Sequence, residues 1–280
     1  MREIDLHVHT TASDGTCTPR EAVSLAAEAG LKAVAVTDHD TAEAHPEARI
    51  AAQALGIEFV PGVEISTRYG VAVHILGYYI DPEEKGMRSL LDWIVEDRAA
   101  RNKKMCALME ADGLPVHYEE MTARFGDVIG RPNFGQVLME LGLAESVKDA
   151  FDHYIEKGQR YYLPRTILPI ERAVEAIVHA GGVAVLAHPF QYRKNDDELR
   201  ELIRHCMDHG LGGMECRYSG YDAEKTAYLE GFAEEYGLLK TGGSDFHGAN
   251  KPHIQIGTGI GGELDVPYEW LERLKEAAGR

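Results

Sequence analysis

Short apolar runs alternate with helical patterns along most of this 280-residue chain, and this alternation constrains the fold more than any other sequence feature. The segment 4–8 is typical of a strand, and TPRE at 18–21 then supplies a helix N-cap, a proline and a capping-box glutamate. Gly30 is placed to end that helix. Strands are expected at 4–8, 33–37, 57–60, 71–79, 183–187, 213–216 and 238–241. Because helical patterns join most of these segments, the sequence predicts an α/β barrel of the (β/α) type, complete or irregular.

The alternation is interrupted in the middle of the chain. Apolar residues at helical spacing predict a long helix over 86–112, and a charge run at 96–104, which includes Arg98 and Arg101, indicates a solvated helix face. Residues 113–160 are typical of short helices without a strand. We therefore expect a barrel domain at 1–95 and 161–280, with a small helical insertion at 96–160 over the barrel mouth.

Charge and hydropathy exclude several classes of partner. The chain has 46 acidic and 29 basic residues, a formal charge of −17, which disfavours long nucleic acid because its binding rewards a basic surface. No apolar run reaches the roughly 18 residues that a membrane span needs, and residues 1–6 have no apolar signal region. The four cysteines lack CxxC spacing, so a zinc knuckle or disulfide framework is not expected. These features predict a cytoplasmic protein without a membrane partner.

Histidines and carboxylates recur where the predicted strands end. His7 and His9 share one face of the first strand because side chains alternate with a period of two. Similar residues follow at TDHD (37–40), PGVE (61–64), His74, AHP (187–189) and SDFH (244–247). In (β/α) barrels the carboxyl ends of the strands form the active site, so these side chains should face one cleft. Asp5, Asp38 and Asp40 are candidates for orienting the imidazoles, and Asp40 is alternatively a helix cap.

This donor set indicates a metal centre. Imidazole nitrogen and carboxylate oxygen without thiolate suit Zn, Mn, Fe or Co in a catalytic site. With one bridging glutamate the candidate ligands suffice for three ions, with positions left for water and substrate; they are His7, His9, Asp14, His39, Glu64, His74, His188, Asp245 and His247. Such a cluster makes hydroxide available near neutral pH and stabilises charge on a phosphoryl transition state.

Six ordered motifs resemble those of the PHP (polymerase and histidinol phosphatase) superfamily. They are DLHVHTTASDGTCTP, VTDHDT, PGVEIS, VHILGYYID, AHP and GGSDFHG, and they extend from residue 5 to residue 248. The resemblance implies an irregular (β/α)7 TIM-like barrel with a trinuclear metal centre. The implied ligand groups are His7, His9, Glu64 and Asp245; Glu64, His74 and His188; and Asp14, His39 and His247. Asp14 replaces a histidine typical of histidinol-phosphatase-like members, so the chain is more similar to the small stand-alone phosphoesterases.

Arginine is the preferred side chain for holding phosphate, since its planar fork matches two phosphate oxygens. The candidates are Arg131, Arg165, Arg193 and Arg217. An arginine-proline motif in the insertion of similar family members favours Arg131, and Arg217 follows because it lies just past a strand end. Arg165 and Arg193 are expected at the surface. Asp245 and His188 are candidates for assisting proton transfer to the leaving alcohol.

The sequence therefore predicts a phosphoesterase that uses a metal-activated hydroxide on small phosphorylated substrates. A nucleoside 3′,5′-bisphosphate ranks above a cyclic phosphodiester or short RNA, and the three divalent ions are expected to be Mn, with Fe or Zn as alternatives. A non-catalytic regulatory PHP module and an amidohydrolase are the other hypotheses. The complete ligand set argues against the first, and the absence of a catalytic lysine motif near mid-chain argues against the second.

Overall fold

The computed structural model describes residues 3–166 and 168–280, and its centre is a nearly closed barrel. Neighbouring strands follow the order β1-β2-β3-β4-β6-β7-β8, while β5 pairs with β3. The strands are β1 (Ile4–Asp5), β2 (Ala33–Val36), β3 (Glu58–Tyr69), β4 (Val71–Tyr78), β5 (Leu168–Pro169), β6 (Val183–Leu186), β7 (Leu211–Tyr218) and β8 (Leu239–Gly243). The first and last strands meet where the Leu6 amide donates to the Gly242 carbonyl over 3.2 Å. The predicted irregular (β/α) barrel is confirmed.

The third strand differs from its prediction. The sequence indicated a strand over 57–60 with Glu64 after its end, but β3 continues to Tyr69 and forms an antiparallel hairpin with β4. Gly70, with a φ of +71°, makes the reversal, a conformation that glycine adopts without steric cost. Glu64 consequently lies inside a strand, where pairing on both sides fixes its position. β4 also runs antiparallel to β6, which makes the barrel irregular.

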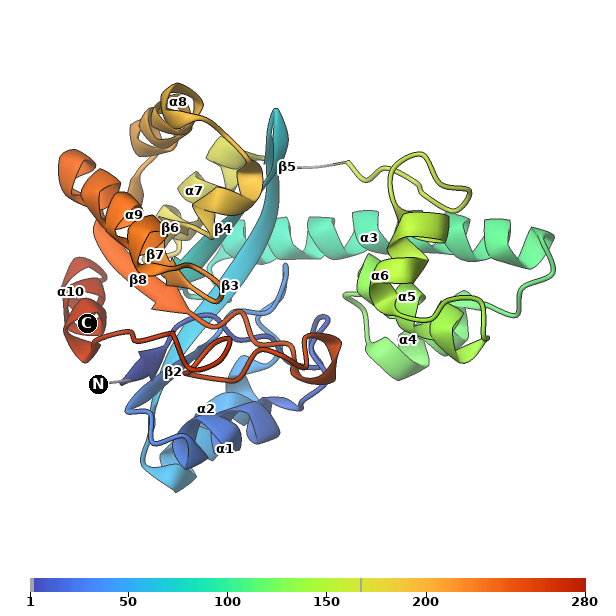
Figure 1. Cartoon of the computed structure of the whole chain (residues 1–280), viewed down its shortest axis with the longest axis horizontal. Helices are drawn as coiled ribbons and strands as arrows, with labels where there is room; N and C mark the ends of the chain where they lie inside the picture. Colours follow the sequence, from blue (N-terminus) through green and yellow to red (C-terminus); the bar gives the residue numbers. More distant parts are fainter. Residues whose placement is uncertain (1–2, 167) are drawn as a thin grey trace.

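Amphipathic helices cover the outside of the barrel (Figure 1). They are α1 (Pro19–Glu28), α2 (His45–Leu55), α7 (Ile170–His179), α8 (Asp196–Asp208), α9 (Ala223–Tyr236) and α10 (Tyr268–Ala277). The predicted capping box starts α1, since the Glu21 amide donates to Thr18 Oγ1 over 3.2 Å. Buried residues of β3, β4 and α7, such as Ile65, Ile75 and Ile177, form the main core. Two short 3₁₀ segments, Pro189–Tyr192 and Gly248–Asn250, follow β6 and β8.

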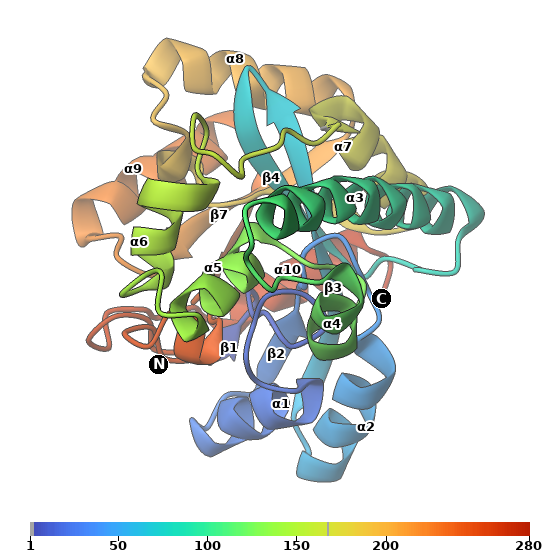
Figure 2. The same ribbon diagram turned by 90° about the vertical axis from the view of Figure 1, so that its right-hand side faces the viewer.

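The residues after β4 build a separate helical lobe, which α3 (Lys85–Ala111) joins to the barrel (Figures 1 and 2). The lobe contains α4 (Tyr118–Phe125), α5 (Arg131–Glu140), α6 (Val147–Ala150) and a π-helical turn (Phe151–Ile155). The first half of α3 packs Met87 and Ile94 into the barrel core, and the second half packs Met105 and Met109 into the core of the lobe.

Between these two cores, α3 presents only part of its charge run to solvent. Arg98 and Arg101 are only 5% and 6% exposed, and Asn102 is fully buried with its amide donating to the Ile129 carbonyl. The prediction was wrong for these two arginines because the barrel and the lobe flank the helix, whereas Glu96, Lys103 and Lys104 of the same run are exposed as expected. Among the described residues, no helix combines the length and the apolar character that a membrane crossing requires.

Candidate metal centre and the adjoining cavity

The structure brings the nine predicted ligands into one cluster, in which Glu64 faces five of the histidines. Glu64 Oε2 lies 3.3 Å from His7 Nε2, 3.2 Å from His9 Nε2 and 3.1 Å from His39 Nδ1. Its other oxygen, Oε1, lies 2.9 Å from His74 Nδ1 and 2.9 Å from His188 Nε2. A single buried carboxylate therefore faces imidazoles that come from four different regions of the barrel.

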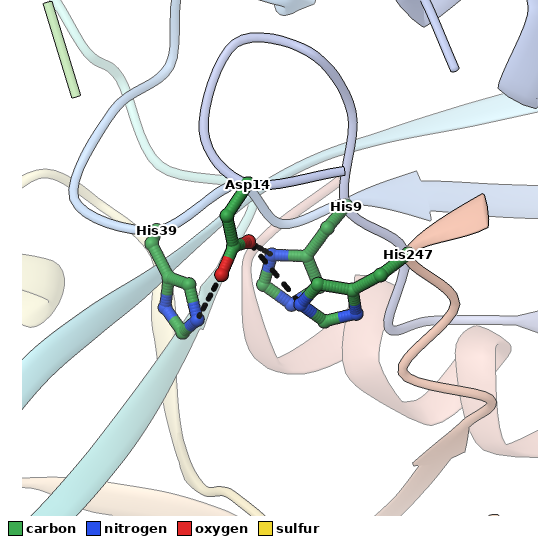
Figure 3. Close-up of side chains that lie close together, drawn as sticks. All are labelled: His9, Asp14, His39 and His247. Carbon is green, nitrogen blue, oxygen red and sulfur yellow. Dashed lines mark ion pairs between the residues drawn. The ribbon is translucent and has the colours of Figure 1, made fainter. Parts of the chain in front are cut away.

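Two further carboxylates complete the cluster. Asp245 Oδ1 lies 3.3 Å from His9 Nε2 and 3.4 Å from His247 Nδ1. Asp14 Oδ1 lies 3.2 Å from His247 Nε2, and Asp14 Oδ2 lies 3.9 Å from His39 Nε2. Figure 3 shows the Asp14 carboxylate between the rings of His39, His9 and His247. Negative and imidazole ligands thus alternate around the mouth of the barrel.

The donor atoms form three groups that fit divalent cations. Within each group the atoms lie within 4.8 Å of one another, and the groups are His9, Asp14, His39 and His247; His7, His9 and Asp245; and His39, Glu64 and His74. In the described part of the chain, several buried donor atoms lack a hydrogen-bond partner, among them His7 Nε2, both nitrogens of His9, and His39 Nδ1. Unsatisfied buried polar atoms are costly, and cations between them would remove that cost.

The pKa shifts of Glu64 and His39 match this use. Those of His7 and His9 do not, because, against the effect of burial, nearby carboxylates raise the pKa of His7 well above its usual value and that of His9 to about 9. Burial alone would raise the pKa of Glu64, but the neighbouring His39, His74 and His7 hold this pKa well below its usual range. Burial, against the opposing charges of Glu64 and Asp14, lowers the pKa of His39 to about 3. Glu64 is therefore ionised and His39 neutral at neutral pH, the forms in which both residues bind metals.

Three acidic residues outside the ligand set form hydrogen bonds with the segments that carry the ligands. Glu215 of β7 accepts from the His188 amide over 2.8 Å, and its other oxygen lies 2.9 Å from His7 Nδ1. Sequence reasoning missed it, although an acidic residue within a buried strand was a usable signal. Asp38 accepts from the Thr10 amide and from Ser13 Oγ, so it holds the loop that carries Asp14 rather than an imidazole. Asp5 accepts from the Ser244 amide over 2.9 Å and thereby fixes the start of the segment with Asp245.

A cavity of about 270 Å³ adjoins the metal-ligand cluster on the side of the helical lobe. Asp14, His39 and His74 line it on one side, and its cationic lining consists of Arg98, Arg101, Arg131 and Arg165. Arg131 was predicted to face phosphate, whereas Arg98 and Arg101 were assigned to a solvated surface and Arg165 to an ordinary surface position. These arginines meet because α3, α5 and the segment returning from the lobe converge above the barrel.

Arg217 is not brought to this cavity. Its guanidinium lies 3.1 Å from Glu230, bonds the Asp265 carbonyl and stacks 4.7 Å from the ring centre of Trp270. The cause is an irregularity in the pairing of β7 with β8 between Glu215 and Arg217, which shifts the alternation of side chains. As a result Tyr218, not Arg217, reaches the cluster, where its hydroxyl donates to Asp245 Oδ2 over 2.5 Å.

Buried imidazoles surround carboxylates at the mouth of this α/β barrel, and a cavity lined by arginines adjoins them. This arrangement is typical of metal-dependent hydrolases of phosphate esters. Comparison with known proteins gives the family. The chain belongs to the PHP domain family, whose model matches residues 5–210. It is accordingly a divalent-metal-dependent phosphoesterase.

Three similar proteins cover nearly the whole chain. The 5′-3′ exoribonuclease Rnm of Salmonella typhimurium is 37% identical over 90% of this chain and 87% of its own length. The 3′,5′-nucleoside bisphosphate phosphatase of Chromobacterium violaceum is 34% identical over 92% of this chain and 91% of its own length. A solved structure from Bifidobacterium adolescentis, assigned as a metal-dependent phosphoesterase, has a TM-score of 0.86 and 31% identity, covering 99% of this chain and 98% of that one.

Proposed function

We propose that the cluster holds three divalent ions, with Mn as the first candidate and Fe or Zn as alternatives. His7, His9, Glu64 and Asp245 would hold one ion; Glu64, His74 and His188 the second; and Asp14, His39 and His247 the third. Three groups of converging donor atoms and the unpartnered histidine nitrogens support cation positions here. The geometric groups divide the ligands differently, with His9 beside Asp14 and His39 beside both Glu64 and His74. Bound ions of this kind lower the pKa of water and neutralise phosphoryl oxygens.

The proposed substrate is a small phosphorylated compound, first of all a nucleoside 3′,5′-bisphosphate that loses one phosphate. The observation that carries this proposal is the arginine-lined cavity beside the cluster, because its size suits a compact anion and its charge suits phosphate. The relative from Chromobacterium violaceum, whose name states this activity, adds support. The net charge of −17 argues against long nucleic acid as a substrate.

Hydrolysis from the 5′ end of short RNA is the second candidate. The relative from Salmonella typhimurium, which is named a 5′-3′ exoribonuclease, favours it. Both candidates place a scissile phosphate at the ligand cluster and use the same arginines, so they differ only in what extends from the cavity.

Within this proposal, Asp245 and His188 assist proton transfer to the leaving alcohol, and Arg131 contacts phosphate. The second oxygen of Asp245 is near two proton-bearing groups, since it accepts from the Tyr218 hydroxyl and from Lys251 Nζ, each over 2.5 Å. Arg131 lies at the cavity with its guanidinium 5.1 Å from the ring centre of Phe151 and 3.1 Å from Glu156.

We further propose a domain division with the barrel at 1–95 and 161–280 and a helical insertion at 96–160 that covers the cavity. Arg131 and Phe151 from the insertion line this cavity. Gln136 of α5 also donates to Asn250 over 2.5 Å, and Asn250 donates to the Asp14 carbonyl over 2.7 Å. These contacts between the lobe and the loops of the ligand cluster support this proposal.

The test is phosphate or nucleotide release by the Mn-reconstituted protein, with bound metal measured in parallel. The substrates are adenosine 3′,5′-bisphosphate, a 2′,3′-cyclic nucleotide, histidinol phosphate and a short 5′-phosphorylated RNA. We expect turnover of the bisphosphate above the others, and loss of it in His39→Ala and Asp245→Ala variants that remain folded by circular dichroism. Turnover of RNA alone would favour the second candidate. Undiminished activity in both variants, or no bound metal, would contradict the proposed centre.

A further inference from the structure

Arg101 differs from every other arginine that lines the cavity. Its side chain is 6% exposed, and its Nε has no hydrogen-bond partner within residues 3–166 and 168–280. No ion pair of its guanidinium is found in the same described ranges. It is nevertheless part of the cavity wall, so an entering molecule can reach it.

The other cavity arginines are already engaged. Asp40, which is fully buried, accepts from Arg98 through two guanidinium nitrogens and lies 3.6 Å from Arg165. Asp40 therefore fastens both the helix that leaves the barrel and the segment that returns to it. Arg131 pairs with Glu156 and stacks on aromatic rings. The structure thus supplies ion pairs for Arg98, Arg165 and Arg131. Arg101 has Asp97, four residues earlier on α3, as an opposing charge, but forms no ion pair with it among the described residues.

A buried guanidinium without an ion-pair partner is unfavourable for the fold. Burial, together with the neighbouring positive charges of Arg98, Arg165 and Arg131 and against the opposing charge of Asp97, lowers the pKa of Arg101 to about 9. The group therefore stays protonated at neutral pH, and the cavity leaves room for an anion to pair with it. A buried, unpaired Arg101 destabilises the protein without ligand. Its presence is explained if a ligand supplies the anion that pairs with it.

We propose that Arg101 is the anion-binding residue for a second phosphate of the substrate, the one that is not hydrolysed. This inference rests on the proposed function and deepens it. The same cavity wall contains His39 and His74 of the ligand cluster, so one molecule can place its scissile phosphate there and its other phosphate on Arg101. The subsite selects a compound with two phosphate groups over one that carries only the scissile group.

The test compares Arg101→Met and Arg101→Lys with Arg88→Met, a control on the same helix whose side chain is exposed and paired with Glu83. In the Mn-loaded protein, kcat/KM is measured for adenosine 3′,5′-bisphosphate and for p-nitrophenyl phosphate, which has only a scissile phosphate. Loss of a charged hydrogen bond predicts a fall of about 10- to 100-fold for the bisphosphate in Arg101→Met, a partial rescue by lysine, and little change for the aryl phosphate. Arg88→Met should leave both unchanged.

Two readouts without turnover separate this inference from the proposed function. Calorimetry on the metal-free protein should show bisphosphate binding that Arg101→Met weakens, and urea unfolding should show equal or greater stability for Arg101→Met than for the wild type. Equal losses on both substrates, bisphosphate binding that is absent or insensitive to Arg101, or a large loss of stability would overturn the inference. If the wild type hydrolyses neither ester, the proposed function fails, while the binding result still decides the role of Arg101.

Discussion

Replacing Asp40 by asparagine should destabilise the protein strongly, because this carboxylate compensates the buried Arg98 and the partly buried Arg165. Arg98 Nε donates to Asp40 Oδ2 over 3.0 Å, and Arg165 Nη1 lies 3.6 Å from the same oxygen. Asparagine keeps the volume and can still accept from the Ser66 amide, which is 2.7 Å from Oδ1. It also tolerates the φ of +57° at this position, so the change removes little besides the charge.

Removing one partner of a buried ion pair costs about 3–5 kcal/mol, since the remaining charge stays buried without compensation. Stability totals of about 5–15 kcal/mol are usual, so the variant should still fold. For a chain of this size the loss corresponds to a Tm lowered by roughly 6–20 °C. Urea unfolding followed by circular dichroism measures the free energy directly, and a thermal scan checks the second value.

Glu140→Gln provides the matched control. Glu140 forms a two-pronged pair with Arg124, at 2.6 and 2.5 Å, but both side chains are about half exposed. Exposed pairs contribute about 0–1 kcal/mol because water screens them. A loss below about 1 kcal/mol in Asp40→Asn, comparable to the control, would refute the idea that this carboxylate fastens the lobe to the barrel.

Three further outcomes follow from the site. Chelation of the metal should lower the Tm, and added Mn should restore it. At a metal concentration 100 times the Kd, binding should raise the free energy of unfolding by about 2.7 kcal/mol. A Tm that does not respond to Mn would contradict the metal centre. Glu215→Gln should weaken Mn binding by about 10- to 100-fold in a calorimetric titration, because Glu215 orients the ring of His7, and an unchanged Kd would contradict that role. Arg217→Met should leave kcat/KM unchanged, since Arg217 faces Glu230 and Trp270; a marked loss would show that it contacts substrate after all.

The sequence alone predicted the barrel, the first helix and which residues converge. These features depend on short-range patterns: the alternation of side chains in a strand sets His7 and His9 on one face, and the capping box at Thr18 starts α1. Placing the carboxyl ends of the strands at one mouth then follows from the barrel itself. The candidate ligands could therefore be named before their distances were known.

Only the tertiary structure decided the surroundings of those ligands. The burial of Arg101 depends on two cores that flank α3, and the orientation of Arg217 depends on an irregular register between β7 and β8. Glu215 meets His7 only because the closure of the barrel brings together two residues that are 208 positions apart in sequence. Such contacts join distant segments, and local periodicity contains no information about them. Sequence motifs therefore determined which residues form the ligand cluster. The charge balance of the adjoining cavity depends on how the lobe packs on the barrel.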